Sequence, residues 1–353
     1  MFLRNCWYVA AWSHEVADEG FLARTIIGLP VVLWRDSARE VVGFVDRCCH
    51  RGAPLSKGRR EGDCIRCMYH GLLFDRSGKC IDVPSQDTVP ANAHVRAFPV
   101  VERDRWIWIW MGDPARADPA AIPDTHWLDD PAWRGKPGYM HYDVSYRLIT
   151  DNLLDFSHLA YVHATTLGGG GSDAYARVRP QVERLDRGVK VTRWLLDDEP
   201  APFVTKLKRY LGKVDRWNIY DFLVPGILLM DSGSAPAGTG APEGRRVDAA
   251  EFRSCQALTP ETEHSTHYFF QQMHNFALDR PEVTQALYES IVAAFHEDQA
   301  MITAQSHTLA QAPDFEFMPI VADSALAQYA RMLEKMIAEE RAAGTKDAVV
   351  RTG

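Results

Sequence analysis

Two pairs of cysteine and histidine in the first quarter of the chain constrain the fold more than any other feature. Cys48 and His50 form the first pair and Cys67 and His70 the second, with sixteen residues between the pairs. Each pair places one thiolate and one imidazole close enough to share the tip of a tight loop. Two such loops facing each other can hold a two-iron cluster, with both cysteines on one iron and both histidines on the other.

This donor set is that of a Rieske [2Fe–2S] centre, in which the two imidazoles raise the reduction potential above that of an all-cysteine cluster. A structural zinc site is the alternative, but zinc modules usually pair cysteine with cysteine and histidine with histidine. Cys64 and Cys67 also form a C-x-x-C, which alone would suit a redox pair or half a zinc site. Glycine and proline beside both pairs favour cluster loops. The other five cysteines are interpreted as buried small hydrophobic residues: Cys6, Cys49, Cys64, Cys80 and Cys255.

Length and charge restrict the class of protein. A chain of 353 residues favours two domains. The formal charge of −8 argues against nucleic acid or an anionic membrane as a partner. The N-terminus lacks the apolar run of a signal peptide, and no stretch approaches the roughly eighteen apolar residues that span a bilayer. An odd number of cysteines near one site suits a reducing compartment, so we expect a cytoplasmic protein.

Short β-branched and aromatic runs dominate residues 7–112. Examples are 31–34, 41–45 and 106–110, which predict strands of a small all-β domain carrying the two cluster loops. A stretch rich in proline and alanine follows Gly112 and is interpreted as a linker. We therefore predict a cluster domain over residues 1–118, a second domain over 119–345 and a frayed tail over 346–353.

The second half of the chain alternates between helical and mixed patterns. We expect helices over Tyr146–His163, from Pro281 to about Leu309, and over Ala325–Arg341, with a mixture of helix and strand up to about residue 275. Two glycine-rich segments, 168–172 and 233–244, are predicted to be mobile loops. Neither follows a strand and opens a helix, so neither is interpreted as a phosphate-binding loop.

Two histidines and one distant carboxylate suggest a second metal site. His158 and His163 would lie about 140° apart on a regular helix, so joint ligation requires the helix to end or widen between them. Asp298 falls in the middle of an apolar helical stripe, where a carboxylate needs a strong partner. The three residues make a 2-His-1-carboxylate set, which holds non-haem Fe(II). Two core histidines and a buried salt bridge of Asp298 remain the alternatives, and Asp155 is expected to orient His158.

Together these motifs resemble the Rieske non-haem iron aromatic oxygenases, oxygenase component, in their short single-subunit-type branch. The resemblance covers most of the chain and adds Asn152-x2-Asp155 before the two histidines. It implies an α+β organisation, with an N-terminal all-β Rieske domain and a helix-grip-like catalytic domain of antiparallel sheet and helices. It also implies a homotrimer in which Asp155 bridges His158 to His70 of the partner subunit, and it places Asn152 near the iron. Trimer against hexamer stays open.

The resemblance further implies a monooxygenase that uses O2 to hydroxylate a methyl or methoxy substituent of an anionic aromatic compound. Because the chain has no flavin or nicotinamide fingerprint, a separate reductase would supply the electrons. The resemblance implies that this reductase carries FMN and a plant-type ferredoxin and uses NAD(P)H. Ring cis-dihydroxylation is the alternative within the class. A Rieske electron carrier with a binding module, or a zinc protein, is the alternative from another class.

Substrate contacts are predicted only from the position of segments. The candidates are Trp217, Asn218, Tyr220 and Gln256. The resemblance implies that some O-demethylating members of the family use polar and aromatic side chains to hold a substrate carboxylate. At the corresponding positions this chain departs from that pattern and has Met230, Gln256 and Glu289. The residue that anchors the acid group is therefore unassigned, and methyl and methoxy groups both remain possible targets.

Overall fold

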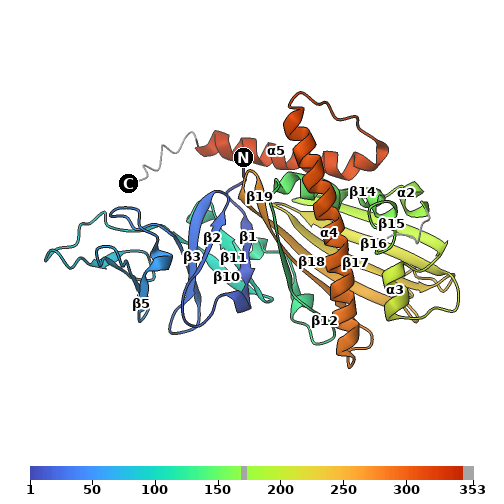
Figure 1. Ribbon diagram of the computed structural model, residues 1–353, viewed down its shortest axis with the longest axis horizontal. Coiled ribbons are helices and arrows are strands. Elements are labelled where there is room, and N and C mark those ends of the chain that lie inside the picture. Colours follow the sequence, from blue (N-terminus) through green and yellow to red (C-terminus); the bar gives the residue numbers. More distant parts are fainter. Residues whose placement is uncertain (168–172, 345–353) are drawn as a thin grey trace. The chain divides into compact units, whose positions relative to one another are not determined.

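The computed structural model describes residues 1–167 and 173–344, and these divide into two compact units (Figure 1). The first unit comprises Met1–Asp124 with two short returns of the chain, Thr259–Glu263 and residues 336–344. The second comprises Thr125–Leu258 and His264–Lys335. The predicted tail and the predicted loop at 168–172 lie outside the described residues.

The first unit is built from three small antiparallel sheets. Their strand orders are β1-β11-β10, β2-β3-β4-β9 and β5-β6-β7-β8. The strands are β1 (Trp7–Trp12), β2 (Leu22–Ile26), β3 (Leu29–Arg35), β4 (Val41–Val45), β5 (Arg59–Glu61), β6 (Cys64–Arg66), β7 (Leu73–Phe74), β8 (Cys80–Asp82), β9 (Ala97–Phe98), β10 (Val100–Arg103) and β11 (Trp106–Trp110). The three runs predicted to be strands fall in β3, β4 and β11, which confirms the all-β character of this part of the chain.

A core of buried side chains supports the cluster loops of the first unit. Trp34 and Phe44 pack edge to face with their ring centroids 4.6 Å apart. They join Leu55, Ile65 and Phe74 in one buried cluster that also contains both predicted cluster cysteines. The loops are therefore anchored on a packed β core, which limits how far their tips can move apart.

One large antiparallel sheet forms the second unit. Its order is β12-β19-β18-β17-β16-β15-β14, with β13 also paired to β19. The strands are β12 (Arg134–Gly135), β13 (Gly138–Tyr142), β14 (Gln181–Leu185), β15 (Gly188–Asp198), β16 (Val214–Leu223), β17 (Ile227–Pro236), β18 (Ala250–Thr262) and β19 (Ser265–His274). This sheet with its helices confirms the predicted α+β organisation.

The described chain also contains short 3-10 helices and the α-helices α1 (Tyr146–Leu154), α2 (Ala174–Arg177), α3 (Pro202–Leu207), α4 (Pro281–Gln311) and α5 (Ser324–Gly344). The long helix α4 crosses one face of the sheet (Figure 1). Phe295 of α4 stacks on Tyr268 of β19, with ring centroids 5.1 Å apart. The predictions of the last two helices are confirmed. Within the described residues, no helix combines the length and the apolarity that a membrane span requires.

The mixture of helix and strand predicted up to about residue 275 is confirmed, because α2, α3 and the six strands β14 to β19 follow His163. The loop predicted over 233–244 is confirmed only in part. The segment 233–244 is not all loop, because β17 continues to Pro236 and Gly233 lies inside it. A Cβ on Gly233 would collide with the indole of Trp217 and lie 2.6 Å from the Ala250 carbonyl oxygen. The glycine serves close packing here rather than a turn.

Candidate metal centres and cavity

The two cluster loops share one backbone arrangement although their histidines are spaced differently. In each loop the cysteine amide donates to the carbonyl five residues on, and the glycine four residues on donates back to the cysteine carbonyl. These distances are 2.8 and 3.0 Å for the Cys48 loop and 2.8 and 2.9 Å for the Cys67 loop. Gly52 and Gly71 have φ of 72° and 79°, the left-handed region that favours glycine. This explains the glycine in each loop.

The four predicted cluster ligands come together at these loops. Cys48 and Cys67 are buried, whereas His50 and His70 are exposed, with their ring centroids 4.5 Å apart. Burial raises the pKa of the Cys48 thiol to about 12, and the neighbouring Cys67 adds to the rise. Two sulfur donors on the inner side and two imidazoles on the outer side fit the donor set of a Rieske cluster.

The second site begins where helix α1 ends. Asp155 follows α1 with extended backbone angles, φ −123° and ψ 93°. Its carboxylate accepts from the Ser157 amide at 2.8 Å and from the Ser157 hydroxyl at 2.7 Å, which caps a short 3-10 helix carrying His158. His163 lies in the following turn. The predicted single helix through both histidines was therefore wrong, and the break is what allows the imidazoles to converge.

Three ligand atoms meet at this break, two of them from the buried residues His163 and Asp298 and one from the half-buried His158. Nε2 of His163 lies 3.1 Å from Oδ1 of Asp298, and Nε2 of His158 lies 3.5 Å from the same oxygen. One ligand atom from each of the three residues can be chosen so that all lie within 4.8 Å of one another. The side-chain amide of Asn152 donates to Oδ1 of Asp298 at 2.9 Å. An ion pair needs only two of these groups, so the convergence of three fits a 2-His-1-carboxylate iron site better.

Hydrogen bonds hold the other nitrogen of each imidazole. Nδ1 of His163 lies 2.7 Å from Oε2 of Glu297, which also accepts from the Thr166 hydroxyl at 2.7 Å. Nδ1 of His158 lies 2.5 Å from the backbone oxygen of Asp155. Asp155 thus contacts this imidazole through its carbonyl group, while its carboxylate bonds to Ser157. Both Nε2 atoms are left facing the site, the usual arrangement for metal-binding histidines.

Electrostatics distinguish the two histidines of this site. Burial lowers the pKa of His158 despite the attraction of Asp298. Burial also opposes protonation of His163, but hydrogen bonds to Asp298 and Glu297 outweigh it and raise that pKa. A divalent cation bound here would replace the proton on His163, because its positive charge also balances the negative charge of the Asp298 and Glu297 carboxylates.

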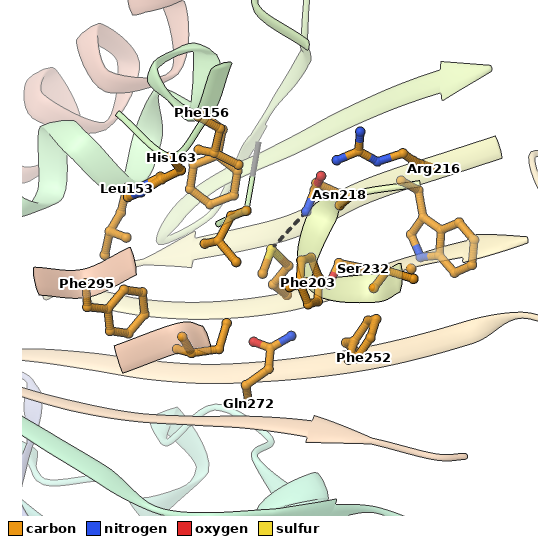
Figure 2. A pocket seen from close by; sticks show the side chains of 18 of the residues that line it. Leu153, Phe156, His163, Phe203, Arg216, Asn218, Ser232, Phe252, Gln272 and Phe295 are labelled. Atoms are coloured by element: carbon orange, nitrogen blue, oxygen red, sulfur yellow. Dashed lines mark hydrogen bonds between the residues drawn. The ribbon is translucent and has the colours of Figure 1, made fainter. Parts of the chain in front are cut away.

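A cavity of about 800 Å³, part of it open to solvent, adjoins the three ligands (Figure 2). One end is formed by Asn152, His158, His163 and Asp298. The walls between are largely apolar and come from α1, α3, α4 and the facing sheet, with Leu153, Phe156, Leu159, Phe203, Phe252, Ile291 and Phe295 among them. Apolar walls with a few polar groups are typical of a site for a small aromatic molecule.

Three of the four predicted substrate contacts line this cavity, namely Trp217, Asn218 and Gln256. Asn218 accepts from the Tyr175 hydroxyl at 2.7 Å. Gln256 is held on both sides, since its amide nitrogen donates to Ser254 at 2.9 Å and its oxygen accepts from Tyr268. Its side chain is therefore committed to the protein rather than available for a ligand.

Tyr220 and Glu289 lie outside the lining of this cavity, and Trp217 borders it with its indole turned away. Tyr220 is not among the lining residues; its hydroxyl donates to the Leu154 carbonyl at 3.3 Å, behind the wall. Trp217 alternates with the cavity-facing residues of β16, so its indole points to the opposite face of the sheet and donates to Asp231 at 2.8 Å. Glu289 is exposed on α4 and accepts from Gln285. None of these three side chains is therefore placed to anchor the acid group of a ligand.

Sequence reasoning missed several polar residues of the site. Glu297 holds Nδ1 of His163, a role that the sequence motifs did not indicate. Arg216, Ser232 and Gln272 line the cavity from three strands. The alternation of polar and apolar residues along each strand shows which side chains share a face of the sheet. It does not show which of the two faces carries the cavity.

Comparison with known proteins decides the family. The model of the Rieske [2Fe-2S] domain matches residues 6–99. The model of the vanillate O-demethylase oxygenase C-terminal domain matches residues 142–339, more than half of the chain. The chain belongs to the Rieske non-haem iron oxygenases. The resemblance inferred from the motifs is confirmed, and with it the Rieske [2Fe–2S] domain and the monooxygenase class.

Relatives of this Rieske oxygenase are similar over nearly their whole length. The iron–sulfur subunit of the toluene-4-sulfonate monooxygenase system of Comamonas testosteroni is 50% identical, over 96% of this chain and 98% of its own. The oxygenase component of dicamba O-demethylase from Stenotrophomonas maltophilia is 37% identical, over 95% and 98%. A crystal structure of dicamba monooxygenase with non-heme iron and dicamba matches with a TM-score of 0.80 and 35% identity, over 97% and 99%.

Proposed function

We propose that this chain is the oxygenase component that hydroxylates a methyl or methoxy substituent of an anionic aromatic compound. The observation that carries the proposal is the largely apolar cavity that ends at His158, His163 and Asp298. Its relatives, whose names specify toluene-4-sulfonate and dicamba, support an aromatic substrate with an acid group. Ring cis-dihydroxylation is kept as an outcome of the test.

In this proposal Cys48, His50, Cys67 and His70 hold the [2Fe–2S] cluster, and the three cavity residues His158, His163 and Asp298 hold Fe(II). When bound, the iron activates O2 and the cluster delivers the electrons that this chemistry consumes. The protein's part is positioning. Leu153, Phe156 and Phe295 hold the ring beside the iron site, and their burial keeps water from the reacting carbon.

The source of electrons is a separate protein in this proposal. We infer an FMN and ferredoxin-type reductase that uses NAD(P)H, because such a protein would reach a cluster whose histidines are exposed.

We further propose a cytoplasmic homotrimer in which Asp155 bridges His158 to His70 of the partner subunit. The exposure of Met68 and Tyr69 beside His70 supports a protein partner at this loop tip. The proposed Rieske domain spans residues 1–118 and the catalytic domain 119–345.

A turnover assay with such a reductase and NADH tests the proposal. O2 uptake, formaldehyde and hydroxylated products would be followed together on methoxybenzoates, methylbenzoates and toluene-4-sulfonate. Formaldehyde in step with O2 identifies an O-demethylase, and a hydroxymethyl product without formaldehyde identifies a methyl hydroxylase. A cis-diol product would contradict the proposal in favour of ring dihydroxylation.

Iron content separates the oxygenase from a mere electron carrier. Two irons per subunit belong to the cluster and one to the 2-His-1-carboxylate site, about three in all. The variant Asp298→Ala should lose only the third iron and all turnover, with the visible spectrum of the cluster unchanged. A wild-type protein with two irons and no O2 uptake would overturn the proposal and favour the carrier.

A further inference from the structure

The cavity has a polar end that faces away from the metal ligands. Arg216 of β16 pairs directly with Ser234 of β17, and Asn218 pairs with Ser232. Side chains of one strand alternate between faces, so these four share the face that lines the cavity. Figure 2 shows Arg216 and Ser232 on the opposite side of the cavity from His163.

Arg216 is a buried cation whose guanidinium has N–H donors that are not used within the described part of the chain. It is 6% exposed, and its Nη1 donates to Oδ2 of Asp198 at 3.1 Å and to the Glu199 carbonyl at 3.4 Å. A guanidinium carries five N–H donors. Within the described part of the chain, Nε and Nη2 have no hydrogen-bond acceptor. The ion pair with Asp198 therefore fixes the guanidinium while leaving its other donors available to a ligand.

Two more buried polar side chains face the same space and have no hydrogen-bond partner among the described residues. Ser232 is 7% exposed and Gln272 is 8% exposed, and both line the cavity. Neither the Ser232 hydroxyl nor the Gln272 amide is hydrogen-bonded to any residue that the structure describes. Buried polar groups are normally paired, so their partner is expected to be the molecule that fills the cavity.

We propose that Arg216, with Ser232, binds the acid group of the substrate, a sulfonate or a carboxylate on the aromatic ring. This inference rests on the proposed function and supplies the anchor that the sequence left unassigned. With the acid group at Arg216 and the ring between the apolar walls, the substituent farthest from the acid group faces His163. Arg216 is thus a specificity-determining residue that selects anionic substrates and sets which carbon reaches the metal site.

The variant Arg216→Gln tests this assignment with matched charged and neutral probes. The probes are toluene-4-sulfonate, 4-methylbenzoate and the neutral toluene-4-sulfonamide, each measured by calorimetric binding to the iron-loaded protein and by turnover. Loss of charge-assisted hydrogen bonds should raise Kd and KM for the anions by about 10–100-fold. The Kd and KM for the neutral sulfonamide should change by less than about 3-fold. Comparing the two anions shows whether the site prefers a sulfonate or a carboxylate.

Arg246→Gln is the matched control, because Arg246 pairs with Asp231 on the opposite face of the same sheet. This variant should leave Kd and KM for all three probes unchanged. If Arg216→Gln does not fold, Arg216→Lys keeps a charge without the planar fork and should raise Kd for the anions several-fold. Ser232→Ala should raise Kd for the anions about 3- to 10-fold.

The outcomes separate the two proposals. Unchanged anion binding in the Arg216 variants, or equal losses for anions and sulfonamide with three irons retained, would overturn the anchor alone. Anions that bind through Arg216 without being oxidised would keep the anchor and overturn the proposed function. A wild-type protein that binds none of the probes would overturn both.

Discussion

Nδ1 of His163 lies 2.7 Å from Oε2 of Glu297, the residue immediately before the candidate iron ligand Asp298. Consecutive residues of α4 therefore serve the same imidazole in two ways. Asp298 approaches Nε2 and Glu297 fixes Nδ1, with the Thr166 hydroxyl donating to the same carboxylate oxygen. A rotation of the His163 ring would break both contacts, so this pair of carboxylates sets the direction in which the imidazole can bind a metal.

The first prediction follows from this contact. Glu297→Gln should weaken iron binding about 10- to 100-fold, because the neutral amide is a poorer acceptor and lowers the basicity of the imidazole. Iron affinity would be measured by titrating Fe(II) into protein from which the mononuclear iron has been removed by a chelator. The cluster spectrum should not change.

Glu289→Gln is the control for this prediction, since Glu289 is exposed on the same helix and its side chain hydrogen-bonds only to Gln285 among the described residues. It should bind iron as the wild type does. Iron affinity within 2-fold of wild type in Glu297→Gln would show that the contact does not support the ligand.

The cluster loops were predictable from sequence because each places its donors within four residues of one another. Asp298 was predictable because a carboxylate in an apolar stripe is anomalous wherever its partners lie. Glu297 and Arg216 were not, since their partners come from segments more than ten residues away. Trp217 shows the remaining difficulty, because its segment was chosen correctly while its side chain points to the other face of the sheet.

The second prediction separates the cluster from a C-x-x-C redox pair. Cys67→Ser should abolish the visible absorption of the cluster and its acid-labile sulfide. Cys64→Ser should retain both, because Cys64 lies in β6 before the loop and, unlike Cys67, does not share the buried cluster with Cys48. Absorption spectra and sulfide content of the two purified variants provide the measurement. Loss of the cluster in both variants would contradict the ligand assignment.

The third prediction concerns the sheet beneath the cavity. Gly233→Ala should destabilise the second unit by about 1–3 kcal/mol, because the added methyl group collides with Trp217 and the β17–β18 backbone. This corresponds to a fall in melting temperature of about 2–10 °C. Gly212→Ala is the control, since a Cβ there meets nothing within 4 Å. Thermal scans followed by circular dichroism should show a drop only for Gly233→Ala, and equal melting temperatures would contradict the packing argument.

The fourth prediction uses Asp151, a half-buried acid of helix α1. Burial raises the pKa of Asp151 from 3.8 to about 6, and Asp323 adds to the rise against the opposing attraction of Arg147. The folded chain therefore holds a proton that the unfolded chain releases between these two pH values. The contribution of this group to the free energy of unfolding therefore falls as pH rises from 3.8 to about 6. Above that pH the folded protein carries the full cost of the charged, half-buried carboxylate.

Asp151→Asn removes the penalty without changing the shape of the side chain. It should stabilise the protein at pH 8 by about 1–3 kcal/mol, and the gain at pH 5 should be about half as large, since the folded carboxyl is then still largely protonated. Melting temperatures at pH 5, 6, 7 and 8 would measure the difference. Asp143→Asn is the control, because the Asp143 side chain is 91% exposed, and it should show no such trend. A gain for Asp151→Asn that does not grow with pH would mean that its carboxylate is already solvated or paired in the folded protein.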